Sequence, residues 1–422
     1  MPASFSVLLG KSVKKIAALR GGGSALPGLF VEKINPSFIK NTLAQLPQGV
    51  VVVSGTNGKT TTTKMVVELL ESQGLKVFTN RTGSNFTRGI AAALLSEIDI
   101  RGKLDTDIAV LELDEAHAIH FVRAVKPRYS LLLNVMRDQL DRFGEIDTTA
   151  KLLQTVAEAT EETVVLNRED PRLLAVGSSI ESNKVVYFGL SDNMRSEFPS
   201  DDDMRSDKLS NITDRPPAIA TLDDLTEDSA VFDINGSKHE TTLKLDGIYN
   251  TFNAAAAIAT VSAILKDELN INSLVARLAT VTPAFGRGEI LTINNQPCEL
   301  VLVKNPSGFR LGLKSFKPDD YSTMIAINDN YADGRDMSWL WDVDFDSLKH
   351  EGVSMVSGIR AYDMALRLQY EEVEIGEVIP SLKQALESFL QSDKPKRIYC
   401  SYTAMLALRR ELGKITEVEA VK

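Results

Sequence analysis

Two hydrophobic periodicities alternate along most of the chain, and together they predict strands followed by helices. From residue 49 to about 190, short apolar runs precede stretches with apolar positions three and four residues apart. Repeated strand–helix units predict a mostly parallel sheet covered on both faces, with ligands at the carboxyl ends of its strands. The expected strands are 49–54, 76–80, 107–113, 129–134, 163–167 and 185–189, and the expected helices begin near 59, 88, 115, 148 and 170.

The same alternation returns after residue 289 and predicts a second α/β domain of Rossmann-like type. We therefore expect a basic N-terminal arm over residues 1–46, a central domain over 47–288 and a C-terminal domain over 289–422. In the last domain the expected strands are 298–304, 323–328, 353–357 and 397–401, and the expected helices are 361–369, 379–391 and 402–412.

Residues 191–230 interrupt the pattern of the central domain. Between Asp192 and Asp228 eleven acids face four bases, and a Pro-Pro pair stands at 216–217. Such a composition is typical of a mobile acidic insertion. The segment contains no cysteine, so we expect no zinc there.

Composition and charge exclude several classes of protein. The chain has 422 residues, of which 43% are hydrophobic and 25% charged, and its net charge of −10 makes nucleic acid an improbable partner. Its two cysteines, Cys298 and Cys400, lie far apart, which suits a reducing cytoplasm. No apolar run approaches the roughly 20 residues of a transmembrane helix, and the N-terminus lacks a clear signal-peptide pattern.

The first 45 residues are basic and carry apolar positions on one predicted helical face. Glu32 is their only acid, against the bases Lys11, Lys14, Lys15, Arg20, Lys33 and Lys40. A basic amphipathic helix can lie on the inner surface of an anionic membrane, but it can equally pack on the main domain, and we favour packing.

The clearest chemical signal is the stretch over residues 50–61, which reads Val-Val-Val-Val-Ser-Gly-Thr-Asn-Gly-Lys-Thr-Thr. A buried strand, a glycine-rich loop and a helix start together form a cradle for phosphate, because backbone N–H groups converge on anionic oxygens. Lys59 is expected to reach the β- and γ-phosphates of ATP, and the Thr60 hydroxyl to hold Mg²⁺.

The short spacing of this loop resembles the Mur ligase family, which also includes folylpolyglutamate synthase. Members of that family use ATP to convert a carboxylate into an acyl phosphate, which an amine then attacks. The resemblance implies a Mur ligase-like central ATPase domain, and it matches Glu112, at the end of a predicted strand, with a metal ligand. Asp114 and Glu115 match an acidic variant of the same motif, although both also suit the N-terminus of a helix.

A later block, Arg-Asp-Gln-Leu-Asp-Arg-Phe-Gly-Glu over residues 137–145, resembles the MurT branch of the family. Asn134 and Asp138 match the general Mur pattern, whereas Gln139 replaces a metal-binding histidine and leaves a second Mg²⁺ site in question. Lys151 stands near the position of a carbamylated lysine in many Mur ligases.

Several other positions follow the family pattern for the nucleotide site. Asn253 matches an asparagine that reads the adenine edge, and Arg287 matches an arginine that neutralises the transferring phosphoryl group. Asn167 matches a turn near the nucleotide, although an Asx-capped helix start explains it equally well. The residues expected to contact ATP are Gly55, Thr56, Asn57, Gly58, Lys59, Thr60, Thr61, Asn167, Asn253 and Arg287; those expected to hold Mg²⁺ are Thr60 and Glu112.

Residues 327–346 combine both tryptophans of the chain with six acids. The stretch Asn-Asp-Asn-Tyr-Ala-Asp-Gly-Arg-Asp-Met-Ser-Trp closely resembles the C-terminal block of MurT. There the matching residue, here Asp336, completes a Cys-His-Asp triad in a partner, the class I glutamine amidotransferase subunit GatD. A carboxylate can orient a histidine that activates a thiol. A solvated acidic turn is the simpler explanation of the same residues.

The resemblance implies an enzyme that amidates the D-isoglutamate α-carboxyl of lipid II, with Lys59, Arg287 and Asp336 in catalytic roles. The phosphate loop begins near residue 54, so an N-terminal UDP-binding domain is not expected. A heterodimer with a GatD-like subunit is expected, because neither cysteine stands in a nucleophile motif. A folylpolyglutamate synthase-like ligase and a non-catalytic ATP-binding scaffold remain the alternatives.

Overall fold

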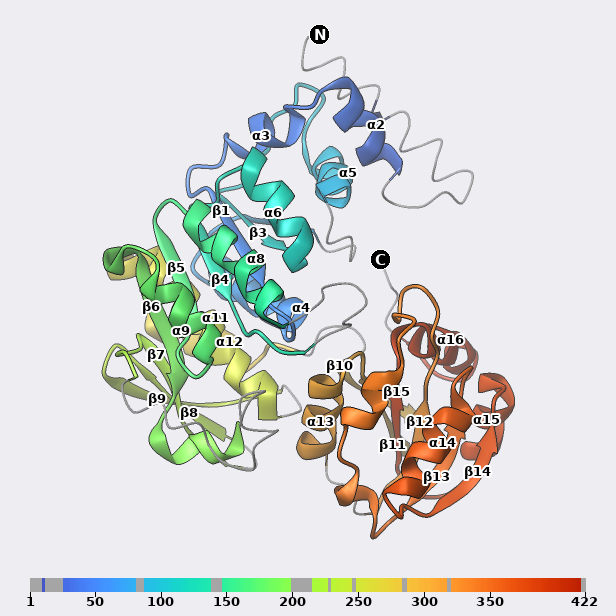
Figure 1. Cartoon of the computed structure of the whole chain (residues 1–422). Helices are drawn as coiled ribbons and strands as arrows, with labels where there is room; N and C mark the ends of the chain where they lie inside the picture. The colour runs from blue at the N-terminus through green and yellow to red at the C-terminus, as the bar shows by residue number, and fades with distance from the viewer. Residues whose placement is uncertain are drawn as a thin grey trace.

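Two separate β-sheets organise the chain, as Figure 1 shows. The computed structural model describes residues 10–11, 26–80, 87–137, 146–198, 215–226, 229–244, 248–282, 287–316 and 320–418. The first sheet has nine strands in the order β2-β3-β1-β4-β5-β6-β7-β8-β9, parallel from β2 to β7 and antiparallel thereafter. Its strands are β1 (Val50–Ser54), β2 (Val77–Thr79), β3 (Ile108–Glu112), β4 (Tyr129–Leu132), β5 (Thr163–Asn167), β6 (Val185–Leu190), β7 (Ala220–Leu225), β8 (Ser229–Ile234) and β9 (Ser237–Thr242).

Helices cover both faces of this sheet because its central strand is apolar on both sides. In β1 the side chains of Val51 and Val53 join one hydrophobic cluster, and those of Val50 and Val52 join another. The first cluster includes α4 (Lys59–Ser72), α11 (Ile248–Leu265) and α12 (Ile271–Leu278). The second includes α3 (Phe38–Leu43), α5 (Thr87–Glu97), α6 (Glu115–Ala124), α8 (Ile146–Ala159) and α9 (Pro171–Ser178).

The second sheet has six strands in the order β10-β11-β15-β12-β13-β14. Among the strands that the structure describes in this sheet, only the edge strand β10 is antiparallel to its neighbour. The strands are β10 (Arg287–Ile293), β11 (Gln296–Leu302), β12 (Ser322–Ala326), β13 (Val353–Ser357), β14 (Ile375–Ile379) and β15 (Lys396–Cys400). The helices are α13 (Pro306–Ser315), α14 (Ala361–Tyr370), α15 (Leu382–Phe389) and α16 (Tyr402–Leu412), and α13 lies on the side that faces the central domain (Figure 1).

The predicted α/β class and the mostly parallel sheets are confirmed, and the ten expected strands are all present within a few residues. The prediction of a mobile acidic insertion over 191–230 is wrong for its described parts, which form a 3₁₀ turn (Asp192–Glu197) and the sheet strands β7 and β8. These strands alternate buried apolar residues, such as Leu222 and Phe232, with half-buried positions that include Asp223 and Asp233. Residues 199–214 and 227–228 lie outside the described residues.

The N-terminal segment packs on the central domain where it is described. Helix α2 (Leu26–Ile34) crosses α5 closely, and a side chain at Gly28 would collide with the Arg88 carbonyl oxygen. Gly10 lies against Val31 and Leu95, so this part of the N-terminal segment also packs on the rest of the chain. Most of residues 1–25 lies outside the described part. Among the described residues, no helix combines the length and apolar character needed to cross a bilayer.

Candidate nucleotide site and the Asp336 loop

The phosphate loop joins β1 to α4 and depends on two glycines in the left-handed region. Gly55 has φ of +131° and Gly58 has φ of +85°, conformations that residues with a side chain rarely adopt. A Cβ atom at Gly58 would also lie 2.7 Å from the Asn253 amide oxygen. The loop can therefore form only with glycine at these positions, and Asn253 lies directly against it.

Charged side chains gather where α4 begins. The Lys59 ammonium donates to the Gly55 carbonyl oxygen at 2.6 Å and lies 3.4 Å from both Asp114 and Glu115. Burial alone raises the pKa of Asp114, but the Lys59 and Lys304 ammonium groups outweigh it and hold that pKa below its ordinary value. Asp114 thus stays ionised beside Lys59, and the Glu115 carboxylate lies at the same distance from the Lys59 ammonium.

The predicted metal-binding pair is close together. The Thr60 hydroxyl donates to a Glu112 carboxylate oxygen at 2.9 Å, across 52 residues of sequence. Hydroxyl and carboxylate oxygens are the ligand types that Mg²⁺ takes beside a phosphate loop. Next to them, the buried Thr61 hydroxyl has no hydrogen-bond partner among the described residues, which fits a loop shaped to receive an oxygen-rich ligand.

An asparagine pair holds the loop against the end of β4. The Asn134 side chain accepts from the Asn57 backbone N–H at 2.9 Å and donates to the Asn57 carbonyl at 3.0 Å. The Thr56 hydroxyl accepts from the Met136 backbone N–H at 3.0 Å. The family pattern matched Asn134 only as a strand end, whereas the structure shows that it fixes the loop backbone.

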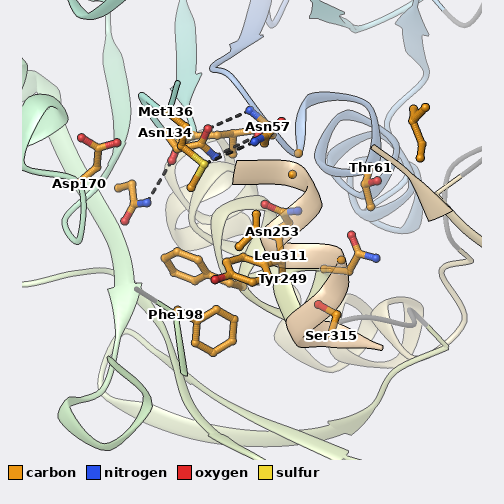
Figure 2. A pocket seen from close by; sticks show the side chains of 18 of the residues that line it. Asn57, Thr61, Asn134, Met136, Asp170, Phe198, Tyr249, Asn253, Leu311 and Ser315 are labelled. Atoms are coloured by element: carbon orange, nitrogen blue, oxygen red, sulfur yellow. Dashed lines mark hydrogen bonds between the residues drawn. The ribbon is translucent and has the colours of Figure 1, made fainter. Parts of the chain in front are cut away.

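A pocket beside the loop is lined by both domains, as Figure 2 shows. Asn57, Asn134 and Met136 lie together at one end, whereas Phe198 and Tyr249 lie at the other. The aromatic rings pack on one another, with Phe198 at 5.3 Å from Tyr249 between ring centroids. The aromatic wall of the pocket consists of Phe188, Phe198, Tyr249 and Phe252. Helix α13 contributes Gly308, Leu311, Gly312 and Ser315 to the pocket lining.

The aromatic residues and the α13 residues that line this pocket were not predicted from the sequence as site residues. Phe188 lies in β6, Phe252 lies in α11, and the centroids of the two rings are 5.3 Å apart. Nothing local in the sequence distinguishes these rings from ordinary core residues. An apolar wall with a few polar groups is suited to a flat base such as adenine.

The remaining predicted nucleotide residues have different surroundings. Asn253 lines the pocket. Asn167 also lines it, but its amide donates to the Leu133 carbonyl and accepts from the Glu169 N–H, so it shapes the β5 turn. The Arg287 backbone opens β10, while its side chain lies outside the described part, as do Asp138 and Gln139. Lys151 is exposed on α8.

Asp170 is a helix cap rather than a surface acid. Its carboxylate accepts from the backbone N–H groups of Arg172 at 2.9 Å and Leu173 at 3.2 Å. It also accepts from the Val135 N–H at 2.6 Å, which ties the end of β4 to the start of α9. Burial raises the pKa of Asp170 to about 6 against the lowering effect of these donors.

The loop that carries Asp336 is anchored at the carboxyl edge of the second sheet. The buried Asp333 carboxylate accepts from the Thr403 backbone N–H at 2.7 Å and its hydroxyl at 2.5 Å. Asp336 accepts from the Ser338 N–H at 2.9 Å, and hydrogen bonds from Ser338 hold the pKa of Asp336 below its ordinary value. An ionised carboxylate is therefore fixed on a half-exposed loop.

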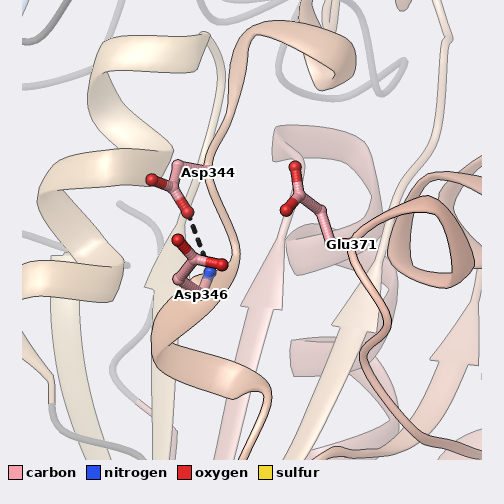
Figure 3. Close-up of side chains that lie close together, drawn as sticks. All are labelled: Asp344, Asp346 and Glu371. Carbon is pink, nitrogen blue, oxygen red and sulfur yellow. Dashed lines mark hydrogen bonds between the residues drawn. The ribbon is translucent and has the colours of Figure 1, made fainter.

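Other acids of this region form a separate group, drawn in Figure 3. One oxygen each from Asp344, Asp346 and Glu371 lie within 4.8 Å of one another. Asp346 pairs with Lys349, and Glu371 pairs with Arg367. These ion pairs supply positive charge at two of the three carboxylates, so the group fits the solvated acidic turn that was the simpler explanation here.

Comparison with known proteins assigns the family. Residues 53–261 match the Mur ligase middle domain, and residues 302–405 match the MurT ligase C-terminal domain. The chain is 31% identical to a curated Streptococcus pneumoniae protein, with 98% of this chain and 97% of that protein covered. That protein is named lipid II isoglutaminyl synthase (glutamine-hydrolyzing) subunit MurT. The chain belongs to the MurT family.

Solved structures show how far the MurT fold extends to other ligases. MurF from Acinetobacter baumannii matches with a TM-score of 0.67 at 17% identity, over 91% of this chain and 80% of that one. E. coli FolC, solved with DHPP and ADP, matches with a TM-score of 0.61 at 15% identity, over 90% and 92% of the two chains. At such identities the likeness shows the Mur ligase fold alone.

Proposed function

We propose that this chain is the ATP-dependent synthetase subunit that amidates the D-isoglutamate α-carboxyl of lipid II, with ammonia made by a GatD-like glutaminase subunit. The observation that carries the proposal is the full-length similarity to a named MurT subunit of lipid II isoglutaminyl synthase. The surroundings of the phosphate loop and of Asp336 support separate steps of that reaction. Both lie at the carboxyl ends of parallel strands, where α/β proteins bind ligands.

The residues that line the two-domain pocket support ATP as its proposed ligand. Lys59 and the backbone of Gly55 to Thr60 would bind the phosphates, and Asn253 with the aromatic wall would bind adenine. Arg287 is proposed for the transferring phosphoryl group from its sequence position alone. Mg²⁺, when held by Thr60 and Glu112, supplies positive charge beside the phosphate oxygens.

The chain's own residues would then favour two successive displacements. First, a substrate carboxylate oxygen bonds to the γ-phosphorus while the bond to ADP breaks and its electron pair stays on ADP. Ammonia next bonds to the acyl carbon, the carbon–oxygen bond to phosphate breaks, and phosphate leaves with one ammonia proton. Both steps gather negative charge beside Lys59, which the acids Asp114 and Glu115 hold in position.

The ammonia is proposed to come from another subunit. Glutaminases use a reactive thiolate, but both cysteines of this chain are buried. Burial raises the pKa of Cys298 to about 12 and also raises that of Cys400, so neither is a nucleophile at neutral pH. The burial of both cysteines thus supports the proposal that an external glutaminase supplies the nitrogen.

A partner surface is proposed around Asp336. Large apolar side chains that follow β12, β13 and β15 stand exposed at the same edge of the sheet: Tyr331, Ile359, Tyr362 and Tyr402. Exposed tyrosines are enriched in protein interfaces. Asp336 could thus place its ionised carboxylate beside a histidine of the glutaminase. Contact of the basic N-terminal segment with the inner membrane surface, near lipid II, is part of the same proposal.

The purified chain alone tests the division of labour. With lipid II, ATP and Mg²⁺, we expect ammonium to drive ADP release and amide formation, and glutamine to drive neither. Lys59→Ala should abolish both products, whereas Lys383→Ala, which changes an exposed lysine of α15, should retain them. Glutamine-driven turnover without a partner would refute the proposed source of ammonia. ADP release with folate and glutamate would instead favour the folylpolyglutamate synthase-like activity.

A further inference from the structure

One buried carboxylate of the central domain, that of Glu169, faces three guanidinium groups. Glu169 follows β5 in the chain and lines the nucleotide pocket. One of its oxygens accepts from the Leu190 backbone N–H at 2.9 Å and from the Arg168 side chain at 3.1 Å. The same carboxylate pairs with Arg195 and Arg215. Glu169 therefore serves as a shared counter-charge for basic groups from different segments of the chain.

Arg215 makes the most contacts in this network. One terminal nitrogen of its guanidinium lies 3.0 and 3.1 Å from the two Glu169 oxygens and 3.1 Å from the Leu190 carbonyl oxygen. The other terminal nitrogen donates to the Asp192 carboxylate. A planar guanidinium can serve several oxygens at once in one fixed geometry, whereas a lysine ammonium is a point charge on a flexible stem. Arg215 therefore joins the ends of β5 and β6 to the start of the 3₁₀ turn Asp192–Glu197.

Two arginines connect the 3₁₀ turn Asp192–Glu197 to Glu169. Arg215 binds the first residue of the turn, and the guanidinium of Arg195, within the turn, lies 3.7 Å from a Glu169 oxygen. The backbone carbonyl of Arg195 accepts from the Phe198 N–H at 3.2 Å. The position of Phe198 therefore depends on a turn that both arginines tie to one buried carboxylate.

Phe198 is the member of the aromatic wall that lies outside both β6 and α11, at the end of the pocket away from the phosphate loop (Figure 2). Its ring packs edge-on against Tyr249, with 5.3 Å between the centroids. On the side of the C-terminal domain, Glu197 lies 4.0 Å from Lys314 of α13, but 52% and 38% of these side chains are exposed. Such an exposed ion pair contributes little, so the buried network around Glu169 is the stronger support of Phe198.

We propose that Glu169 and Arg215 are positioning residues that seat Phe198 in the nucleotide pocket and thereby set the affinity for the base rather than for the phosphates. This inference rests on the proposed binding of ATP. An aromatic ring beside a flat base contributes by stacking and by excluding water. It contributes most when its position is fixed before the ligand binds. The phosphate loop is held by other contacts, those between Asn134 and Asn57, so its affinity for phosphates is separate.

Substitution of Arg215 disturbs the fold less than substitution of Glu169, which would leave buried guanidinium groups without their counter-charge. Titration calorimetry would compare the Kd of ADP–Mg²⁺ with that of pyrophosphate–Mg²⁺, which has phosphates but no base. We expect Arg215→Met to weaken ADP binding about tenfold, the effect of losing one stacking ring, and to bind pyrophosphate within about twofold of wild type. Arg277→Met is the matched control and should equal wild type, because Arg277 pairs with Glu68 at 3.0 Å in the same domain but does not line the pocket.

A double substitution shows whether Arg215 acts through Phe198. Phe198→Ala should weaken ADP binding at least as much as Arg215→Met does. The double variant should bind ADP no more weakly than Phe198→Ala alone, because both changes remove the same part of the pocket wall. Arg215→Lys, which keeps the charge but not the planar fork, should lie between wild type and Arg215→Met. It carries the same comparison, with a smaller loss, if Arg215→Met does not fold.

Hydrogen exchange provides a readout that needs no nucleotide. The amides of residues 190–198 should exchange faster in Arg215→Met than in wild type, whereas those of residues 54–61 should not change. The inference would be overturned by unchanged exchange over 190–198, by unchanged ADP affinity, by an equal loss of ADP and pyrophosphate affinity, or by additive losses in the double variant. If wild type itself binds no ADP, the proposed function fails, while the exchange over 190–198 still decides whether Arg215 holds the turn.

Discussion

Replacing Asp170 with alanine should destabilise the central domain and, through it, the nucleotide site. The Asp170 carboxylate satisfies three backbone N–H groups at the junction of β4, β5 and α9, of which the Val135 bond is 2.6 Å long. Val135 adjoins Asn134, whose side chain holds the Asn57 backbone of the phosphate loop. Loss of the carboxylate therefore loosens both the start of α9 and the support of the loop.

The expected loss of stability follows from the backbone N–H groups that lose their acceptor when Asp170 is replaced. Loss of the helix cap costs about 1 kcal/mol, and an unsatisfied buried N–H at Val135 costs about 1–3 kcal/mol. The expected destabilisation is thus roughly 2–4 kcal/mol. Asp147→Ala is the matched control, because Asp147 contacts the same Arg172 at 3.3 Å but its side chain is 70% exposed. That change should cost less than about 1 kcal/mol.

Two signals separate the domains in this assay. Both tryptophans, Trp339 and Trp341, lie in the C-terminal domain, so urea unfolding followed by their fluorescence serves as the internal reference. Hydrogen exchange over residues 129–137 and 163–178 reports the region around Asp170. We expect faster exchange there and weaker ADP binding in Asp170→Ala, with unchanged fluorescence midpoints. Equal effects of Asp170→Ala and Asp147→Ala would refute this account of the junction.

Three further outcomes are expected. Gly58→Ala should abolish ADP binding, because φ is +85° and a Cβ atom would lie 2.7 Å from Asn253. Gly74→Ala is the control: its φ is +88° but no atom lies within 4 Å of the added Cβ, so it should change only stability. Equal ADP binding by the two variants would contradict this. Asp336→Asn should leave ammonium-driven turnover intact and lower glutamine-driven turnover at least about 100-fold in the complex, and equal loss of both would remove its triad role. The raised pKa of Asp170, about 6 against an ordinary 3.8, means that the folded chain binds the extra proton, so stability relative to Asp170→Asn should fall by about 2 kcal/mol as pH rises from about 4 to 7. Urea titrations at both pH values measure that difference, and a rise in relative stability would reverse the argument.

The sequence predicted the parallel sheets well because their strands carry strong local signals. The run of four valines at 50–53 is apolar on both faces, and a loop with two glycines ends it. Such a strand can only lie inside a sheet that helices cover on both sides. The prediction that Thr60 and Glu112 act together came from the resemblance to the Mur ligases, and the structure explains their contact, because β1 and β3 are parallel neighbours whose carboxyl ends meet.

Features that depend on distant contacts could not be predicted in the same way. Helix α13 contains two glycines and was not expected, and its start is defined by the cap from Asn305. The aromatic wall of the pocket combines rings from β6, from α11 and from the residue after the 3₁₀ turn Asp192–Glu197, and in the sequence these rings look like ordinary core residues. The strands β7 and β8 were not predicted because Asp223, Asp224 and Asp233 interrupt their apolar residues within a segment whose composition is acidic.

The most direct test of the central claim follows the nitrogen atom. The chain, isolated with its glutaminase from the native cell, would receive lipid II, ATP, Mg²⁺ and glutamine labelled with ¹⁵N at the amide. We predict that mass spectrometry of the stem peptide will show one labelled amide in place of the D-isoglutamate α-carboxyl, with one ADP per amide and none in Lys59→Ala. Glutamine hydrolysis and ADP release with no labelled stem peptide would contradict the account.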